Sequence, residues 1–447
     1  MSLAWYCLGC PTSLSTWDSW ISCLYRKNNR LFNLFHKYTR EERLSYPSHD
    51  PLHQVSVLQQ CLSGGKKRIG LFLGAGCPMS IKGENQQPLI QDIAGITKSV
   101  GDKLTSCSEI EAPYALAEEQ LKKDGIPEPN VEHLLTHIRA LRAVAGTDQV
   151  RGLTAEQLDA LDERICDLIH QEVNKDLPSG PTPYHSVALW TDGIPREFQV
   201  EIFTTNYDLL LEQALEDSRV PYFDGFSGVR RPIFNPRAIE EERLLPQWTR
   251  LWKLHGSINW YQNENGEVFR GTASETAIRR VIHPSHLKYQ ESRRMPYLAM
   301  VDRLRTFLSD PTAALVLCGY SFRDDHINDT IMQGLQHTQT SVAFALAYGS
   351  LEHSPDATTL AKSRPNLNVL AKDGGVIGSQ QYAWPRRPYQ PESGNEANPV
   401  SWEPAGQEEE NSEQIAQFNL GDFRAFGRFL QSLVGDGMWP REVASNG

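Results

Sequence analysis

The sequence predicts an α/β protein with a mostly parallel sheet and a helical module inserted after the first strand. Short apolar runs that end in glycine or polar residues occur in four stretches: Ile69–Gly76, Glu201–Leu215, Leu251–Trp260 and Ala314–Asn328. Between the first two runs, residues 84–190 carry apolar positions at helical spacing. Because ligands bind outside the carboxyl ends of parallel strands, the four run ends predict a single site.

The composition is that of a large globular protein. The chain has 447 residues, of which 40% are hydrophobic and 22% charged, and these fractions argue against a mostly disordered chain. One α/β domain with insertions and two domains are both compatible with this length. The formal net charge of -11 gives no overall basic surface, which disfavours direct nucleic-acid binding and favours a small ligand or a protein partner.

The cysteine pattern and the hydropathy indicate a cytoplasmic protein without a membrane segment. Eight cysteines are scattered without a regular spacing, as expected for reduced thiols. Only Cys7 and Cys10 form a CxxC pair, and we predict no metal site, because a tetrahedral zinc site needs about four ligands. No apolar run approaches the roughly 18 to 20 residues of a spanning helix, and the start of the chain lacks the basic region of a secretion signal.

Changes in composition divide the chain into three parts. Residues 1–60 are expected to form an N-terminal arm or helical extension, residues 61–380 the main α/β domain, and residues 381–447 a flexible linker with a closing helix. Within the last part, residues 384–412 are rich in Pro, Gly, Asn and Glu and predict a loop, whereas residues 422–435 have the apolar spacing of an amphipathic helix.

The helical module contains His133, His137 and His170. The first two have an i,i+4 spacing that a metal site can use, but no HExxH glutamate accompanies them. We therefore interpret these histidines as surface or packing residues.

The first apolar run, Ile69–Leu73, predicts a buried parallel strand. Gly74 and Gly76 after it would let the backbone approach a pyrophosphate where a side chain would block it. The run matches only part of the GxGxxG pattern, so a structural glycine turn is the alternative, and it is favoured if this motif is taken alone.

The second run ends in a cluster of polar side chains. Thr204, Thr205, Asn206 and Asp208 follow the apolar residues 202–203. Helix capping explains one Asn or Asp at a helix start, but it does not require the whole cluster. Capping and ligand binding are therefore equal alternatives for this stretch.

The third run delivers His255, with Gly256 directly after it. A lone histidine is usually structural. At a strand end beside glycine, however, a histidine has room, exposure and a pKa suited to proton transfer near neutral pH. We therefore favour a functional role for His255.

The fourth run is followed by Gly319, which can admit a ribose or phosphate, and by Ser321, which can hydrogen-bond to it. Asp324 and Asp325 come next and are placed to cap the helix that follows. Capping is the interpretation that we adopt for at least one of these two aspartates.

In this order, GAG at 74–76, TTNYD at 204–208, HG at 255–256 and GYSFRDDHIN at 319–328 resemble the sirtuin-like domain of bacterial NAD-cleaving anti-phage defence proteins. The segments NVEHLLTHI and VPYFDGF are also similar, so the resemblance spans residues 66–350. It implies a Rossmann-like fold with a helical module after the first strand. It also makes residues 61–380 an NAD-binding catalytic domain.

The resemblance assigns roles to individual residues. It implies that Asn206 holds the nicotinamide ribose and the attacking water, that Asp208 lies near the carboxamide, and that His255 acts as the base. The NAD contacts that it implies elsewhere are Gly74, Ala75 and Gly76 at the phosphates, Gly319 and Ser321 at the second ribose, and Thr205 as a further member of the binding set.

Two departures from the protein-deacylating sirtuins bear on the reaction. Those enzymes carry a zinc module of two CxxC pairs after the catalytic histidine, whereas this sequence has no cysteine between Cys166 and Cys318. Their Pro-Asp-Phe-Arg segment after the glycine motif is replaced here by CPMSIKGENQQPL. Both departures weaken deacylation and favour hydrolysis of NAD.

The sequence therefore predicts an NAD hydrolase that releases ADP-ribose and nicotinamide and acts in anti-phage defence by depleting NAD. NAD is its expected substrate, and no metal is expected. Such an activity must be restrained, so we expect a homo-oligomer or a separately encoded partner such as a ring ATPase. An NAD-dependent protein deacylase and a non-catalytic NAD or ADP-ribose binding module are the alternatives.

Overall fold

The computed structural model describes residues 48–83, 86–240, 247–263, 267–271, 296–388, 390, 398–405 and 413–435, together with the main chain of residues 279–282. One compact unit begins at His49. Cys7, Cys10 and residues 1–47 of the predicted N-terminal arm lie outside the described residues. In the rest of that arm, residues 51–60 belong to helix α3 (Pro51–Ser63), and Asp50 caps the start of this helix.

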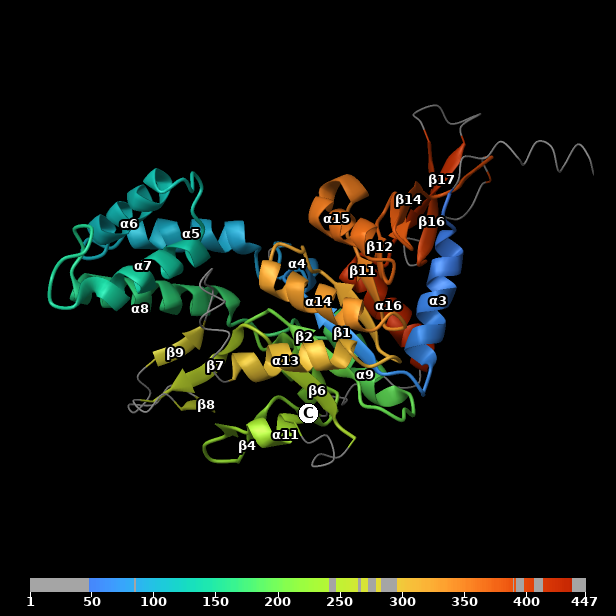
Figure 1. Cartoon of the computed structure of the whole chain (residues 1–447), viewed down its shortest axis with the longest axis horizontal. Helices are drawn as coiled ribbons and strands as arrows, with labels where there is room; N and C mark the ends of the chain where they lie inside the picture. Colours follow the sequence, from blue (N-terminus) through green and yellow to red (C-terminus); the bar gives the residue numbers. More distant parts are fainter. Residues whose placement is uncertain are drawn as a thin grey trace, which may run out of the picture. The chain divides into compact units, whose positions relative to one another are not determined.

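The described residues form a nine-stranded sheet in the order β14-β13-β12-β11-β10-β1-β2-β6-β3 (Figure 1). Its strands are β1 (Ile69–Leu73), β2 (Glu201–Thr204), β3 (Tyr222–Phe223), β6 (Thr249–Lys253), β10 (Ala314–Cys318), β11 (Val342–Leu346), β12 (Leu367–Leu370), β13 (Gly374–Ile377) and β14 (Gln380–Ala383). Only β13 and β14, at one edge, are antiparallel to their neighbours. The predicted Rossmann-like α/β class with a mostly parallel sheet is confirmed.

Helices cover both faces of this sheet, which explains why its inner strands are continuous apolar runs. All residues of β1 are buried. Leu71 and Leu73 belong to one core with residues of α3, α9, α10 and α16, whereas Phe72 belongs to a second core with residues of α13, α14 and α15. These helices are α9 (Pro183–Gly193), α10 (Leu210–Asp217), α13 (Tyr297–Leu308), α14 (Asp325–His337), α15 (Pro355–Ser363) and α16 (Phe423–Val434). The strand ends are thus fixed between two packed layers of helices.

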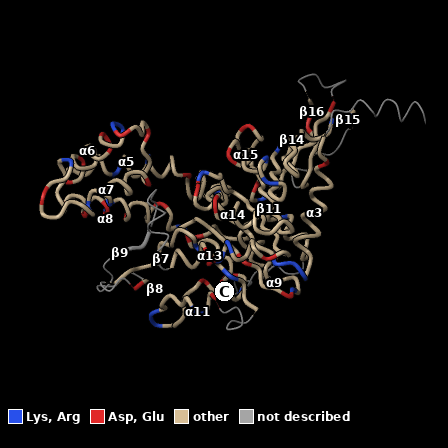
Figure 2. Tube along the Cα trace, in the orientation of Figure 1, with Lys and Arg blue, Asp and Glu red and all other residues tan. Residues whose placement is uncertain are grey.

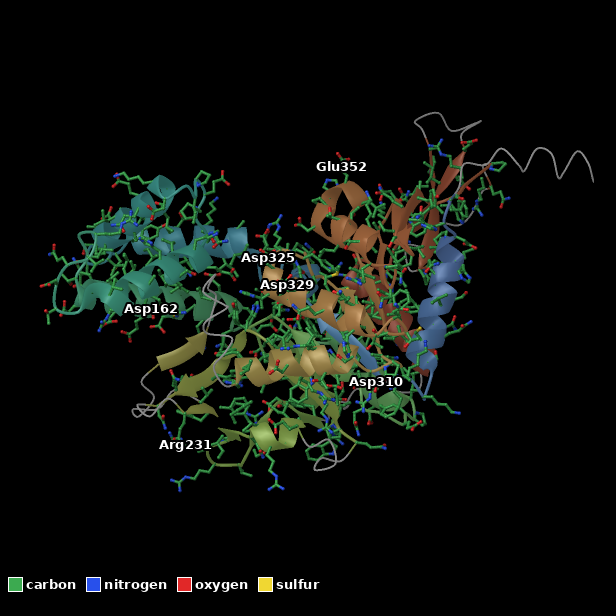
Figure 3. All side chains as sticks on the ribbon, in the orientation of Figure 1. Asp162, Arg231, Asp310, Asp325, Asp329 and Glu352 are labelled. Atoms are coloured by element: carbon green, nitrogen blue, oxygen red, sulfur yellow. The ribbon has the colours of Figure 1, made fainter. Side chains whose placement is uncertain are left out.

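The helical module predicted after the first strand is confirmed. After the short helix α4 (Gly76–Ser80), the module comprises α5 (Ile93–Thr105), α6 (Glu111–Lys123), α7 (Val131–Ala145) and α8 (Ala155–Val173), and α5 to α8 pack together (Figure 1). Arg139 of α7 pairs with Asp162 of α8 at 2.6 Å. Figure 3 labels Asp162 on this module. Charges of both signs are distributed along these helices (Figure 2). Within the described ranges, no helix combines the length and the apolar character needed to cross a membrane.

The histidines of the module contribute to its packing. His133 completes a capping box at the start of α7, where its Nδ1 accepts from the backbone N–H of Asn130 at 3.1 Å. The Nε2 atom of His137 lies 2.8 Å from Oε1 of Gln120, and burial lowers the pKa of this histidine. His170 lies in the last turn of α8. The packing interpretation is confirmed for His133 and His137.

A second, antiparallel sheet has the order β4-β5-β8-β7-β9. Its strands are β4 (Phe226–Ser227), β5 (Ile233–Phe234), β7 (Gly256–Gln262), β8 (Val268–Arg270) and β9 (Arg279–Ile282), and α11 (Pro236–Glu240) follows β5. Strand β7 begins directly after His255, whereas β6 ends at Lys253. His255 therefore lies where the chain passes from one sheet to the other.

The prediction of a loop over residues 384–412 is wrong for part of this stretch, which forms strands. Strands β15 (Arg386–Arg387) and β16 (Val400–Pro404) join β17 (Gln414–Phe418) in a small antiparallel sheet. Residues 389, 391–397 and 406–412 lie outside the described residues. Tertiary packing overrides the loop-like composition here, because β17 buries every second side chain. The closing helix predicted over 422–435 is confirmed as α16.

Candidate functional site

The four strand ends singled out from the sequence lie in one row. In the parallel register, Leu73 of β1 is aligned with Thr204 of β2 on one side and with Cys318 of β10 on the other, and Thr204 is aligned with Lys253 of β6. From β1 the chain builds β2 and β6 on one side and β10 to β12 on the other. The row therefore includes the point where the strand order reverses, which is where open α/β sheets bind ligands.

The loops after β1 and β10 touch each other through glycines. Gly74 donates its N–H to the carbonyl of Cys318 at 2.9 Å, and Gly76 donates to the carbonyl of Gly319 at 2.9 Å. A Cβ atom on Gly74 would lie 2.3 Å from the carbonyl oxygen of Gly319. Gly319 itself has a φ of +68°, which favours glycine. These glycines are thus needed for the contact between the two loops. Ala75, between the first two glycines, is exposed.

The Thr204–Asp208 loop is tied to the first glycine loop. The hydroxyl of Thr204 donates to the carbonyl of Leu73 at 2.7 Å and accepts from the N–H of Asn206 at 3.0 Å. The Nδ2 group of Asn206 donates to the carbonyl of Gly74 at 3.1 Å. The amide of Asn206 is therefore held beside the strand-order reversal, and the neighbouring Thr205 is half-buried.

His255 is paired with Asp324, the residue that caps α14. Its Nε2 lies 2.9 Å from Oδ2 of Asp324, and the two side chains are 13% and 9% exposed. The other carboxylate oxygen accepts from the backbone N–H groups of His326 and Ile327. Asp324 therefore caps the helix, as predicted, and also orients the imidazole. A base held by a third group is the arrangement that proton transfer uses.

Asp208 is buried, and it lines a small cavity next to the strand ends. Its Oδ1 accepts from the N–H of Leu210 at 3.1 Å, and burial raises the pKa of its carboxyl, an effect that the ammonium of Lys253 opposes. The cavity is lined by Leu73, Tyr184, Thr204, Asn206, Asp208, Leu211, Glu212 and Lys253. Asn206, Asp208 and the buried Lys253 thus line the same small cavity.

The profile of the family described as SIR2-like domain matches residues 200–368. The matched range is less than half of the chain and runs from β2 into β12. Among solved structures, one described as "Structural Basis for the Mechanism and Regulation of Sir2 Enzymes" is similar with 11% identity and a TM-score of 0.32, over 68% of this chain and 89% of that chain. No curated protein matches the chain.

The range matched by the profile contains Asn206, Asp208, His255 and Gly319. Gly74, Ala75 and Gly76 precede that range, but the strand register brings their loop to the same row. Ser321 lies in the exposed loop between β10 and α14. The structure therefore brings the loops of all four motifs together at the carboxyl ends of the strands.

Two residues that the sequence does not single out, Lys253 and Glu212, also lie in the matched range. Their side chains pair at 2.8 Å and are both buried. A signal was available, because a lysine between Trp252 and Leu254 interrupts an otherwise apolar strand end, and lysine is almost never fully buried unless it is paired.

Substituting Gly74 with alanine is expected to destabilise the fold by about 1–3 kcal/mol, which is the usual cost of overpacking. The added methyl group would meet the backbone of Gly319 and push the two loops apart. Urea denaturation measures this cost. Gly271→Ala is the matched control, because a Cβ there meets no described atom within 4 Å. Equal midpoints for both variants would contradict the close contact.

Proposed function

We propose that this protein is an NAD hydrolase that converts NAD to ADP-ribose and nicotinamide. The observation that supports it best is the pairing of His255 with Asp324 at 2.9 Å, next to the loop in which Asn206 is bonded to Gly74. A SIR2-like domain fits an enzyme that uses NAD. An oriented base and a fixed amide at adjacent strand ends are what the cleavage of a nicotinamide–ribose bond requires.

In the proposed reaction, water replaces nicotinamide on the ribose. The bond from C1′ to the pyridinium nitrogen breaks, and its electrons leave with nicotinamide. The oxygen of water bonds to C1′, and the proton of that water passes to His255. Asn206 positions the ribose and the water, which lowers the entropic cost of the attack.

Asp208 would bind the carboxamide of nicotinamide. Its carboxyl oxygens can accept a hydrogen bond from the NH2 group of the carboxamide. The loops of Gly74, Ala75 and Gly76 and of Gly319 and Ser321, together with Thr205, would contact the phosphates and the second ribose, so residues 61–380 would form the catalytic domain. NAD is the substrate in this proposal, and no metal takes part.

The biological role that we propose rests on the resemblance of the motifs. Depletion of cytoplasmic NAD would arrest a phage-infected cell. Self-assembly or a separately encoded partner, such as a ring ATPase, would restrain the enzyme until infection. Light scattering of the purified chain tests this regulation, because a monomer with unrestrained activity would contradict it.

Chromatography of NAD after incubation with the purified full chain tests the reaction. We expect nicotinamide and ADP-ribose in equal amounts without any added acceptor, because water is the acceptor. Release of nicotinamide only after addition of an acylated peptide would instead indicate a protein deacylase. Tight binding of NAD in calorimetry without any turnover, even with assembled partners, would indicate a binding module.

A further inference from the structure

Lys253, the last residue of β6, contacts the loop after β2 that carries Asn206 and Asp208. Its side chain is buried, with 2% of its surface exposed. The ammonium group donates to the carbonyl of Asp208, lies 3.5 Å from the carbonyl of Tyr207, and pairs with Oε1 of Glu212 at 2.8 Å. One cation thus joins the end of β6, the loop after β2 and the first turn of α10.

Stability alone does not explain this buried pair. Moving two charges out of water costs as much as their attraction returns in many proteins, and apolar residues of similar volume often replace such pairs without loss. The neighbours of Lys253 in the sequence are apolar, and Leu251, Trp252 and Leu254 are all buried. What lysine adds is three donors on one group, which can hold several acceptors at once.

The acceptors belong to the loop that carries the proposed catalytic side chains. Tyr207 and Asp208 directly follow Asn206, and their carbonyls lie between the end of β2 and the start of α10. The N–H of Ile258 also donates to the carbonyl of Tyr207, at 3.0 Å, so β7 and Lys253 hold the same peptide group. Because these carbonyls are held in place, the side chains of Asn206 and Asp208 project from the loop in fixed directions.

Glu212 keeps Lys253 in place. It is buried in the first turn of α10 and lines the same cavity as Asn206, Asp208 and Lys253. Burial raises the pKa of the Glu212 carboxyl, and Lys253 opposes that effect. Glu212 of α10 therefore holds the ammonium group of Lys253 next to the loop.

We propose that Lys253 is a positioning residue, held by Glu212, that fixes the Thr205–Asp208 loop for binding and cleavage of the ligand. The expected effect of Lys253 on turnover rests on the proposed function. The expected effect of Lys253 on the order of the loop does not rest on it, and the two effects are measured separately.

The experiment replaces both charges at once with Lys253→Met/Glu212→Met. An apolar pair fills the space without leaving an uncompensated charge, so this variant should melt near the parent temperature. Amide hydrogen exchange at residues 205–208 should become about tenfold faster or more, because the loop opens more readily. The kcat for NAD should fall on the order of a hundredfold, because a small misplacement of catalytic groups has that effect, and KM should change much less.

Parent-like exchange together with parent-like kcat in the double variant would show that the pair is only structural and would overturn the proposal. If the parent itself does not cleave NAD, the proposed function fails, and the exchange rates still decide the role of Lys253. If the methionine pair does not fold, Lys253→Gln/Glu212→Gln keeps a hydrogen-bonded pair with a shorter reach toward the loop, and the same two readouts decide.

Arg68→Met/Asp310→Met is the matched control. Arg68 pairs with Asp310 at 2.8 Å, and the two residues precede β1 and β10, at the strand ends opposite the Thr205–Asp208 loop. This change removes two paired charges in the same way without touching the loop carbonyls, so exchange and turnover should stay at parent values. Equal losses in this control and in Lys253→Met/Glu212→Met would overturn the specific role of Lys253.

Discussion

Replacing His255 with alanine is expected to lower the turnover of NAD by about a hundredfold or more, because general base catalysis commonly contributes that much. The protein should still melt near the parent temperature. His255 lies between β6 and β7, outside both strands, and its side chain is partly exposed. Its removal leaves the apolar core of the sheet intact. Chromatography of NAD and a thermal melt measure the two expectations.

Two aspartates that are neighbours in the sequence provide the matched comparison. Asp324→Asn keeps a side-chain oxygen to cap α14 but loses the carboxylate that faces His255, so we expect reduced turnover with little loss of stability. Asp325→Asn changes an exposed residue of the same helix (Figure 3) and should leave turnover unchanged. Normal turnover in His255→Ala, or its failure to fold, would contradict the proposed site.

Strands and helices that have a clear pattern of apolar residues in the sequence could be predicted. A strand buried on both faces is a continuous apolar run, as in Ile69–Leu73, and the helices of the module have apolar residues at helical spacing. The strands at Val400–Pro404 and Gln414–Phe418 could not be predicted in the same way. Their pairing with each other, rather than their composition, makes them strands.

The same division applies to the site. The four polar strand ends are visible in the sequence because each follows its own apolar run. The pairs that orient them join distant segments, as between His255 and Asp324 or between Lys253 and Glu212, and no spacing in a single sequence indicates such pairs. The glycines show a further limit. The sequence predicts a ligand contact at Gly74, whereas in the structure a Cβ at this position would first meet the backbone of Gly319.

Asn206→Ala is expected to reduce NAD turnover by about a hundredfold or more, because the side chain that positions ribose and water is lost. The loss of stability should be only about 1 kcal/mol, the net contribution of a typical hydrogen bond. The bond in question joins Nδ2 of Asn206 to the carbonyl of Gly74. Turnover by chromatography and unfolding in urea measure the two effects on one preparation.

Asn235→Ala controls for the hydrogen bond itself, and Asn206→Asp controls for the shape of the side chain. Asn235 also donates from Nδ2, to the hydroxyl of Ser227 at 3.0 Å, in a part of the chain that takes no role in the proposed reaction, so its loss should leave turnover unchanged. Aspartate at position 206 keeps the shape but directs a carboxylate oxygen at the carbonyl of Gly74. Because a carboxylate cannot donate there, we expect Asn206→Asp to lose turnover as Asn206→Ala does. Parent-like turnover in both variants at position 206 would show that the amide has no part in the reaction.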